Sequence, residues 1–141
     1  MVYSSTRLEE IHPSFGQNWK SLTCNLADGD ITPASLWELP NLQELNPQGN
    51  RFIRLNFSLL QLPWLKYLNI SSCYHLVELP DLPSSIAVVK ADWCRSLESF
   101  GNISNCKWLW KVSLLGKNKL GLLGGDILLN SMLRDMFHLV H

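Results

Sequence analysis

The chain has 141 residues, of which 46% are hydrophobic, and its 12 lysines and arginines balance 12 aspartates and glutamates. This length fits one domain, and the apolar content excludes wholesale disorder. The zero net charge argues against nucleic-acid binding and electrostatic membrane anchoring, because both need a basic surface. No apolar run approaches the roughly 18 residues of a membrane span, and the chain does not start with an apolar signal segment. We therefore expect a cytoplasmic or nuclear protein.

Residues 1–18 show no periodicity and are expected to form a loosely ordered lead-in. Residues 19–118 carry a repeated apolar pattern. Leu42–Asn50 (LQELNPQGN) matches Leu65–Cys73 (LKYLNISSC), and Ile86–Cys94 (IAVVKADWC) is the next copy. A fourth copy starts at Leu109, and the shift from one copy to the next is nearly constant. An earlier and poorer copy is expected to end at Asn25, with Leu22 three residues before it.

The shared pattern L-x-x-L-x-L-x-x-(N/C) is the leucine-rich-repeat signature. Its alternating apolar residues are typical of a half-buried strand, and one repeat alone cannot bury the apolar face of that strand. We therefore expect four to five repeats to stack as an α/β leucine-rich-repeat solenoid with a parallel sheet on its concave face. The clearest strands should centre on Leu45, Leu68, Val89 and Val112.

Asn50, Cys73 and Cys94 close three of the copies at the turn after the strand, and the fourth copy ends at Lys117, one residue before Asn118. At this turn a short polar side chain can bond main-chain groups of the adjacent repeat. Cys73 and Cys94 are interpreted as small buried substitutes for Asn, with a disulfide or a metal pair with His75 as the alternatives. Pro47 occupies a strand slot, so the strand should be short or broken there.

The return path of each repeat is expected to be irregular, because prolines such as Pro63, Pro80 and Pro83 disfavour regular elements. Ser58–Leu62 is the best candidate for a single helical turn. Residues 119–141 are expected to form a glycine hinge, Gly121–Gly125, and a helix from Asp126 to Phe137 that caps the solenoid.

The stretch LNISSCYHLVELPDLPSSIAVVKADWCRSLESFGNISNC resembles the last repeats of plant TIR-NB-LRR disease resistance proteins. Its specific marks are ELPDLPSS, a strand that ends in Cys94, and then SLES. The segment CNLADGDI is similar to an earlier repeat of the same family, and the resemblance runs from about Leu22 to Leu133. It implies a protein-recognition module that takes part in pathogen effector recognition and defence signalling.

The family's TIR domain and its nucleotide-binding domain are absent from the sequence, which contains no G-x-x-x-x-G-K-[ST] loop. The chain therefore looks like a truncated gene model, a partial gene or a short paralogue. No catalytic motif is found, and the histidines His12, His75, His138 and His141 form no chelating set. We expect no enzyme, no metal and no cofactor.

The residues between the inward-facing leucines are expected to face outward in three columns on the concave sheet. The first column is Trp19, Glu44, Tyr67, Val88 and Lys111. The second column is Ser21, Asn46, Asn69, Lys90 and Ser113. The third column is Thr23, Gln48, Ser71, Asp92 and Leu115. Mixed polar and aromatic side chains favour a protein-binding face, although an ordinary solvated face is the alternative.

The sequence has six tryptophans, Trp19, Trp37, Trp64, Trp93, Trp108 and Trp110. Trp64 and Trp93 are interpreted as partly buried packing, and Trp108 and Trp110 as a cover for the open end of the solenoid, with an aromatic hot spot as the alternative.

The partner is expected to be a pathogen effector or another domain of the receptor, with self-association through an uncapped N-terminal end. The alternative functions are a generic intracellular adaptor, such as a ubiquitin-ligase substrate receptor, a secreted ectodomain, or a non-functional truncated paralogue.

Overall fold

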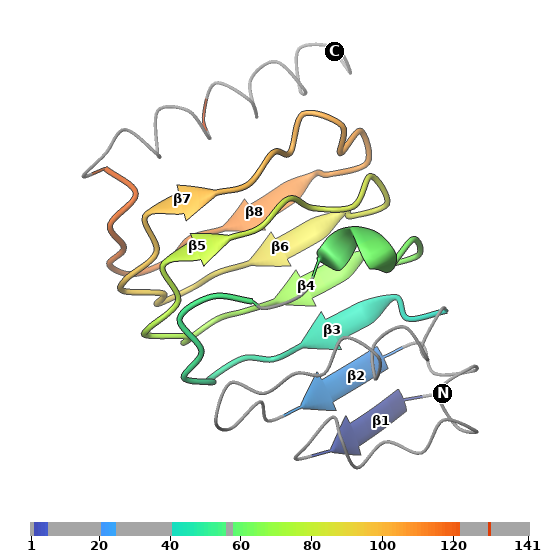
Figure 1. Cartoon of the computed structure of the whole chain (residues 1–141), viewed down its shortest axis with the longest axis horizontal. Coiled ribbons are helices and arrows are strands. Elements are labelled where there is room, and N and C mark those ends of the chain that lie inside the picture. The colour runs from blue at the N-terminus through green and yellow to red at the C-terminus, as the bar shows by residue number, and fades with distance from the viewer. Residues whose placement is uncertain (1, 6–20, 25–40, 56–57, 122–129, 131–141) are drawn as a thin grey trace.

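The computed structural model describes residues 2–5, 21–24, 41–55, 58–121 and 130 of the chain. Within these residues, six short strands form one parallel sheet in the order β1, β2, β3, β4, β6, β8 (Figure 1). Their bounds are Val2–Ser5 (β1), Ser21–Cys24 (β2), Glu44–Asn46 (β3), Tyr67–Asn69 (β4), Val88–Lys90 (β6) and Lys111–Ser113 (β8). The expected parallel sheet is therefore confirmed, and its assignment as a leucine-rich-repeat solenoid stays a prediction.

The register of the sheet follows the shifts found in the sequence. Leu45 pairs with Leu68, Leu68 with Val89, and Val89 with Val112. Because successive side chains of a strand point to opposite faces, this register places the four apolar residues on one face. Leu45, Leu68 and Val89 are buried, so the alternation of apolar residues builds the core side of the sheet as expected.

The register of the first repeat differs from the expected one. Leu22 pairs with Leu45, and Ser21 pairs with Glu44. Leu22 therefore occupies the middle slot of the repeat, two residues from the slot assigned from the sequence, and Ser21 replaces Trp19 at the head of the first column. A shift of two residues keeps every side chain on the same face, so apolar alternation alone does not distinguish these two registers.

The sheet also begins earlier than expected. Val2–Ser5 pairs in parallel with Ser21–Cys24, although the sequence predicts no regular element within residues 1–18. A strand of 4 residues is too short to show a periodicity in the sequence. Its pairing with the neighbouring strand β2 is what forms it. The other boundaries of the lead-in lie outside the described residues.

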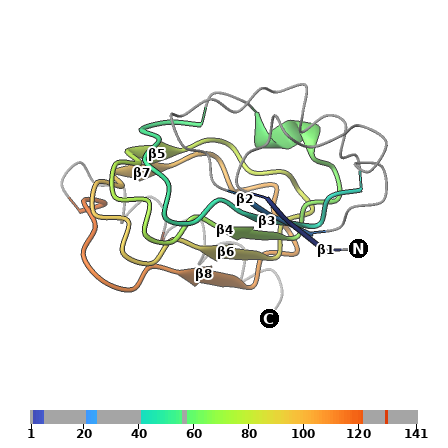
Figure 2. The same cartoon turned by 90° about the horizontal axis from the view of Figure 1, so that it is seen from below.

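Two return segments form a second small sheet. Glu78–Leu79 (β5) pairs in parallel with Ser99–Phe100 (β7), where turns and irregular pieces were expected. These strands point against the direction of the main sheet (Figure 1) and lie on the opposite side of the molecule from β4, β6 and β8 (Figure 2). Pro80 follows β5 directly, which favours extended backbone at Leu79 and then ends the strand.

The return segment before β4 contains the expected helical turn. It is a 3₁₀ helix, η3, at Leu59–Gln61, and the Ser58 hydroxyl caps it by accepting a hydrogen bond from the Leu60 amide at 3.2 Å. Leu59 is fully buried, whereas Leu60 is 53% exposed. The turn therefore inserts one leucine into the core and leaves the next in solvent.

The core lies between the main sheet and the return segments. It is lined almost entirely by leucine, isoleucine, valine, phenylalanine and cysteine, with residues such as Leu68, Ile70, Leu76 and Ile86 fully buried. Each such side chain contributes about 1.5–3 kcal/mol on leaving water. Strand β3 ends at Asn46, directly before the buried Pro47, as the sequence predicts.

The expected C-terminal helix lies almost entirely outside the described residues. Only Asn130 of that segment is described, and it is helical. The capping helix and its glycine hinge therefore stay predictions.

Candidate functional site

The first expected column is an unbroken row across four strands. Glu44 pairs with Tyr67, Tyr67 with Val88, and Val88 with Lys111. Glu44 and Lys111 are exposed, and Tyr67 and Val88 are half-buried. The row therefore presents an acid, an aromatic ring, an aliphatic side chain and a base on the face opposite the core.

The second column is continuous over three strands, because Asn69 pairs with Lys90 and Lys90 with Ser113. Its members are not equally available. Asn69 is only 8% exposed, whereas Lys90 is half-buried. The amide of Asn69 accepts a hydrogen bond from the Ser71 N–H at 3.0 Å and donates one to the Gln48 side chain at 3.4 Å. Asn69 therefore links the second column to the third.

The third column is a ladder of hydrogen bonds between neighbouring repeats. The Ser71 hydroxyl accepts a hydrogen bond from the Asp92 N–H at 3.2 Å. The Oδ1 atom of Asp92 accepts one from the Ser113 hydroxyl at 2.5 Å and one from the Leu115 N–H at 2.9 Å. With only 9% of its surface exposed, Asp92 joins two repeats, and its Oδ1 atom faces the protein and not a partner.

The eleven candidate residues thus divide into two sets. Five take part in the side-chain ladder: Gln48, Asn69, Ser71, Asp92 and Ser113. The other six form the sheet face, the name kept below for Glu44, Asn46, Tyr67, Val88, Lys90 and Lys111.

The closing residues of the repeats bond main-chain carbonyls, as expected. Asn50 donates to the Pro47 carbonyl at 2.7 Å, and the thiol of Cys73 donates to the same carbonyl at 3.4 Å. The Cys94 thiol donates to the Ile70 carbonyl of the preceding repeat at 3.0 Å. Cysteine therefore replaces asparagine as a buried donor.

The buried cysteines are poor nucleophiles. Cys73, Cys94 and Cys106 are free thiols, so the alternative of a Cys73–Cys94 disulfide is wrong. Burial raises the pKa of Cys73 to about 12 and that of Cys106 to about 11, and it also raises the pKa of Cys94. A reactive cysteine has a lowered pKa, so these thiols have a structural role. In the described ranges, no three metal-binding side chains cluster.

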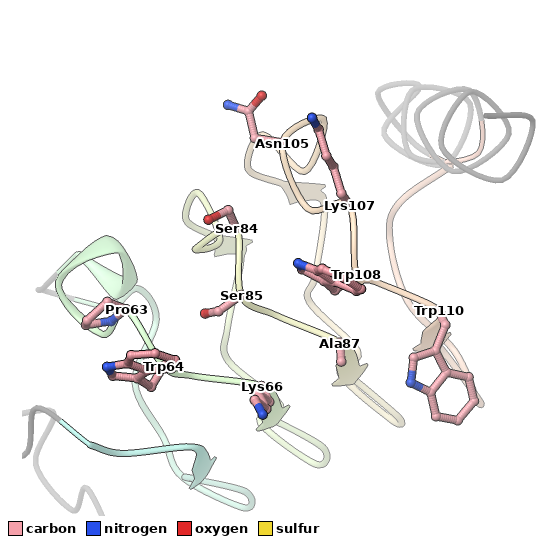
Figure 3. Close-up of a pocket in the computed structure, with 10 residues that line it drawn as sticks. All are labelled: Pro63, Trp64, Lys66, Ser84, Ser85, Ala87, Asn105, Lys107, Trp108 and Trp110. Carbon is pink, nitrogen blue, oxygen red and sulfur yellow. The ribbon is translucent and has the colours of Figure 1, made fainter. Parts of the chain in front are cut away.

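A groove that the sequence did not predict crosses three repeats. Its volume is about 800 Å³, and Trp64, Trp108 and Trp110 line it (Figure 3). These tryptophans are 57%, 75% and 64% exposed. Trp64 is thus partly buried, as expected, and so is Trp93, which is 53% exposed and packs its ring against the backbone of Gly116. Trp108 and Trp110 line the groove. The terminal helix under which they were expected to cover the open end lies outside the described residues apart from Asn130, so that interpretation stays a prediction.

The groove results from the repeat spacing. Trp64, Ser85 and Trp108 each directly precede the first framework position of a repeat, at Leu65, Ile86 and Leu109, so they line up from repeat to repeat. The middle repeat contributes small side chains to the lining, including Ser85 and Ala87, between the tryptophans of the repeats on either side (Figure 3). The shifts that align the leucines also align this column, so the repeat spacing in the sequence is the signal that indicates it.

The groove is also basic. Lys66 and Lys107 line it together with Asn105, and no carboxylate does. Both lysines are exposed. Among the described residues, the ion pair found joins Arg54 to Glu78, away from the groove. The groove therefore combines aromatic walls with two cations that no lining carboxylate neutralises.

Over part of its length the chain is similar to plant disease resistance proteins of the TIR-NB-LRR class. It is 35% identical to TMV resistance protein N of Nicotiana glutinosa over 69 residues, which are 49% of this chain and 6% of that protein. It is 34% identical to Disease resistance-like protein DSC1 of Arabidopsis thaliana over 90 residues, 58% of this chain and 7% of the relative. The predicted resemblance is confirmed, and the chain is related to proteins of plant defence.

The chain spans less than a tenth of either relative's length. No family model matches it, and no solved structure does. In the described part of the chain, no helix has the length and apolar character needed to cross a membrane.

Proposed function

We propose that this chain is a non-catalytic protein-recognition module of a plant intracellular immune receptor, which contributes to pathogen effector recognition and to the defence response. The observation that carries this proposal is its partial similarity to two plant disease resistance proteins. The module acts in the cytoplasm or the nucleus. Its partner is an effector protein or another domain of the receptor.

The sheet face is the proposed contact surface. The row Glu44, Tyr67, Val88 and Lys111 crosses four adjacent strands, and Lys90 and Asn46 flank it. Interfaces favour an aromatic residue among polar neighbours, and charges of both signs at the rim select the partner.

The size of the face predicts weak binding by this chain alone. Strands of a sheet are about 4.8 Å apart, so the four strands that carry the sheet face span only about 14 Å along the stacking direction. A standard interface buries roughly 800 Å² on each partner. Tight recognition therefore needs contacts from further repeats or domains.

The test compares pathogen growth in three plant lines: one that lacks the gene, one that carries the Tyr67→Ala/Lys111→Glu variant, and the wild type. We expect the first two to be more susceptible to the same pathogen strain. A line with Glu78→Gln, which changes a side chain of the second sheet, is the matched control and should resist like the wild type.

The alternatives predict other results. An adaptor of a ubiquitin ligase predicts that ligase subunits copurify with the chain and that resistance is unchanged in the variant lines. A non-functional truncated paralogue predicts equal growth of every strain in all lines. Either result would reject the immune function.

Self-association is part of this proposal. In the described sheet, β1 is the first strand of the order, and an edge strand offers backbone groups to another chain. Zero net charge provides little repulsion against such contact. Light scattering of the 141-residue chain should show species larger than a monomer, and a monodisperse monomer would reject this part of the proposal.

A further inference from the structure

We propose that the groove between Trp64 and Trp108 binds an acidic, proline-containing peptide segment of a partner protein in the polyproline II conformation. The peptide axis lies along the direction in which the repeats stack. This inference goes beyond the proposed immune function, because it concerns a second surface. It rests on the shape, spacing, backbone bonding and charge of the groove.

The shape of the groove suits an extended peptide that carries proline rings. Trp64 stands on one side of the groove, and Trp108 and Trp110 stand on the other, with Ser85 and Ala87 of the middle repeat between them (Figure 3). More than half of each tryptophan surface is exposed. Aromatic grooves of this kind accept proline rings, whose rigid backbone loses little entropy on binding.

The spacing of the walls matches the repeat of the peptide. Trp64 and Trp108 occupy equivalent positions two repeats apart, which corresponds to about 9.6 Å at a strand spacing of about 4.8 Å. A polyproline II helix rises about 3.1 Å per residue with three residues per turn, so prolines at i and i+3 share one face about 9.3 Å apart. One proline can therefore meet each tryptophan wall.

Two backbone N–H groups of the groove lining are already hydrogen-bonded to the neighbouring repeat. The N–H of Ala87 donates to the Lys66 carbonyl at 2.8 Å, and the N–H of Trp110 donates to the Ala87 carbonyl at 3.0 Å. Recognition by strand addition requires free backbone groups. A polyproline II peptide has no internal ladder and binds through side chains, which is the mode that this groove permits.

The charge of the groove selects an acidic peptide. Lys66 and Lys107 line it without a carboxylate among the lining residues. Glutamates between the prolines would meet these ammonium groups, whereas a basic peptide would be repelled.

The test is a titration of the intact 141-residue chain, followed by tryptophan fluorescence. The probe is a peptide of about twelve residues with proline at every third position and glutamate at most others. One control peptide has the same composition with its prolines in a block at one end, and another has lysine in place of glutamate. We expect the first peptide to bind at least about tenfold more tightly than either control.

Variants then locate the binding. Trp64→Ala and Trp108→Ala should each weaken binding about tenfold or more, as central aromatic residues do. Trp93→Ala is the matched control, because Trp93 is 53% exposed but does not line the groove. Lys66→Glu/Lys107→Glu should reverse the preference between the glutamate and lysine peptides. The changed side chains are exposed, and circular dichroism should show an unchanged fold.

Three results would overturn the proposal. The first is equal binding of the regular and the block peptide. The second is an equal loss in Trp93→Ala and Trp64→Ala. The third is a groove that binds a neutral oligosaccharide, with cellohexaose as the probe, more tightly than the acidic peptide, because this would show that the tryptophans stack on sugar rings.

Discussion

The carboxylate of Asp92 accepts a hydrogen bond from the hydroxyl of Ser113 at 2.5 Å, and this bond joins the repeat of β6 to that of β8. The same Oδ1 atom accepts a bond from the Leu115 N–H at 2.9 Å. Asp92 thus lies in a column that was expected to face solvent, but it is nearly buried and connects two repeats. Its position in the sequence suggested partner binding, whereas its contacts indicate stability.

Asp92→Ala should lower the free energy of unfolding by about 1.5–3 kcal/mol, because hydrogen bonds to a charged group contribute this much. The loss should be larger than for Ser113→Ala, which removes one of the two donors. Urea denaturation measures both. Lys90→Ala, on a neighbouring position of the sheet face, should change stability by less than about 0.5 kcal/mol. An equal loss for Lys90→Ala and Asp92→Ala would contradict a structural role for the ladder.

Stability should fall as the pH rises above about 9. Burial raises the pKa of Cys73 from 9.0 to about 12 and that of Cys106 to about 11. In this range the unfolded thiols lose protons that the folded thiols retain, so deprotonation favours unfolding. The stability that the protonated Cys73 thiol contributes is fully present below pH 9 and is lost as the pH rises to about 12. Urea denaturation over this range should show a shallower decline for Cys73→Ala, and an unchanged decline would refute the assignment.

Gly101→Asn should be strongly destabilising. A Cβ atom at Gly101 would clash with the backbone of Asp81 and Pro80 in the adjacent return segment. Overpacking of this kind costs about 1–3 kcal/mol or more. Gly49→Asn is the matched control, because a Cβ at Gly49 meets nothing within 4 Å and its φ of +75° is one that asparagine tolerates. Thermal melts of the two variants should differ clearly, and equal melting temperatures would be incompatible with the close approach at Gly101.

Glu78→Gln should have a small effect. The Arg54 Nε and Glu78 Oε1 atoms are 3.0 Å apart, but the two side chains are 60% and 49% exposed. Solvent screens such pairs, which contribute about 0.2–1 kcal/mol. Denaturation at low and at high salt should show that the small difference from the wild type disappears at high salt. A salt-independent loss of more than about 2 kcal/mol would mean that Glu78 has another structural role.

Much of the fold could be predicted because the number of residues between equivalent positions of two repeats sets which residues of adjacent strands pair. The shifts between Leu45, Leu68, Val89 and Val112 were sufficient to align four strands correctly. The first repeat was misaligned because its leucine pattern is weak, and a two-residue shift of Leu22 preserves the same apolar face. Where a repeat has few framework leucines, only the neighbouring strand determines its register.

The candidate site could be predicted less well, because exposure and bonding depend on the neighbouring repeat. The sequence places Asn69 and Asp92 on the outer face, and that placement is compatible both with partner binding and with a ladder. Which one occurs depends on distances of about 3 Å between side chains that belong to different repeats. Trp64 and Trp108 are likewise far apart in the sequence, and only the stacking of the repeats brings them to one groove.

The sequence by itself determined the parallel sheet, the spacing of its central strands and the closing residues Asn50, Cys73 and Cys94. It could do so because alternating leucines at a constant shift can bury their side chains only by stacking in that register. The tertiary structure decided the pairing of Val2–Ser5 with β2, the second sheet of β5 and β7, the ladder through Asp92, and the tryptophan groove. Each of these depends on contacts between chain segments distant in sequence, and their energies become available only when the repeats pack against one another.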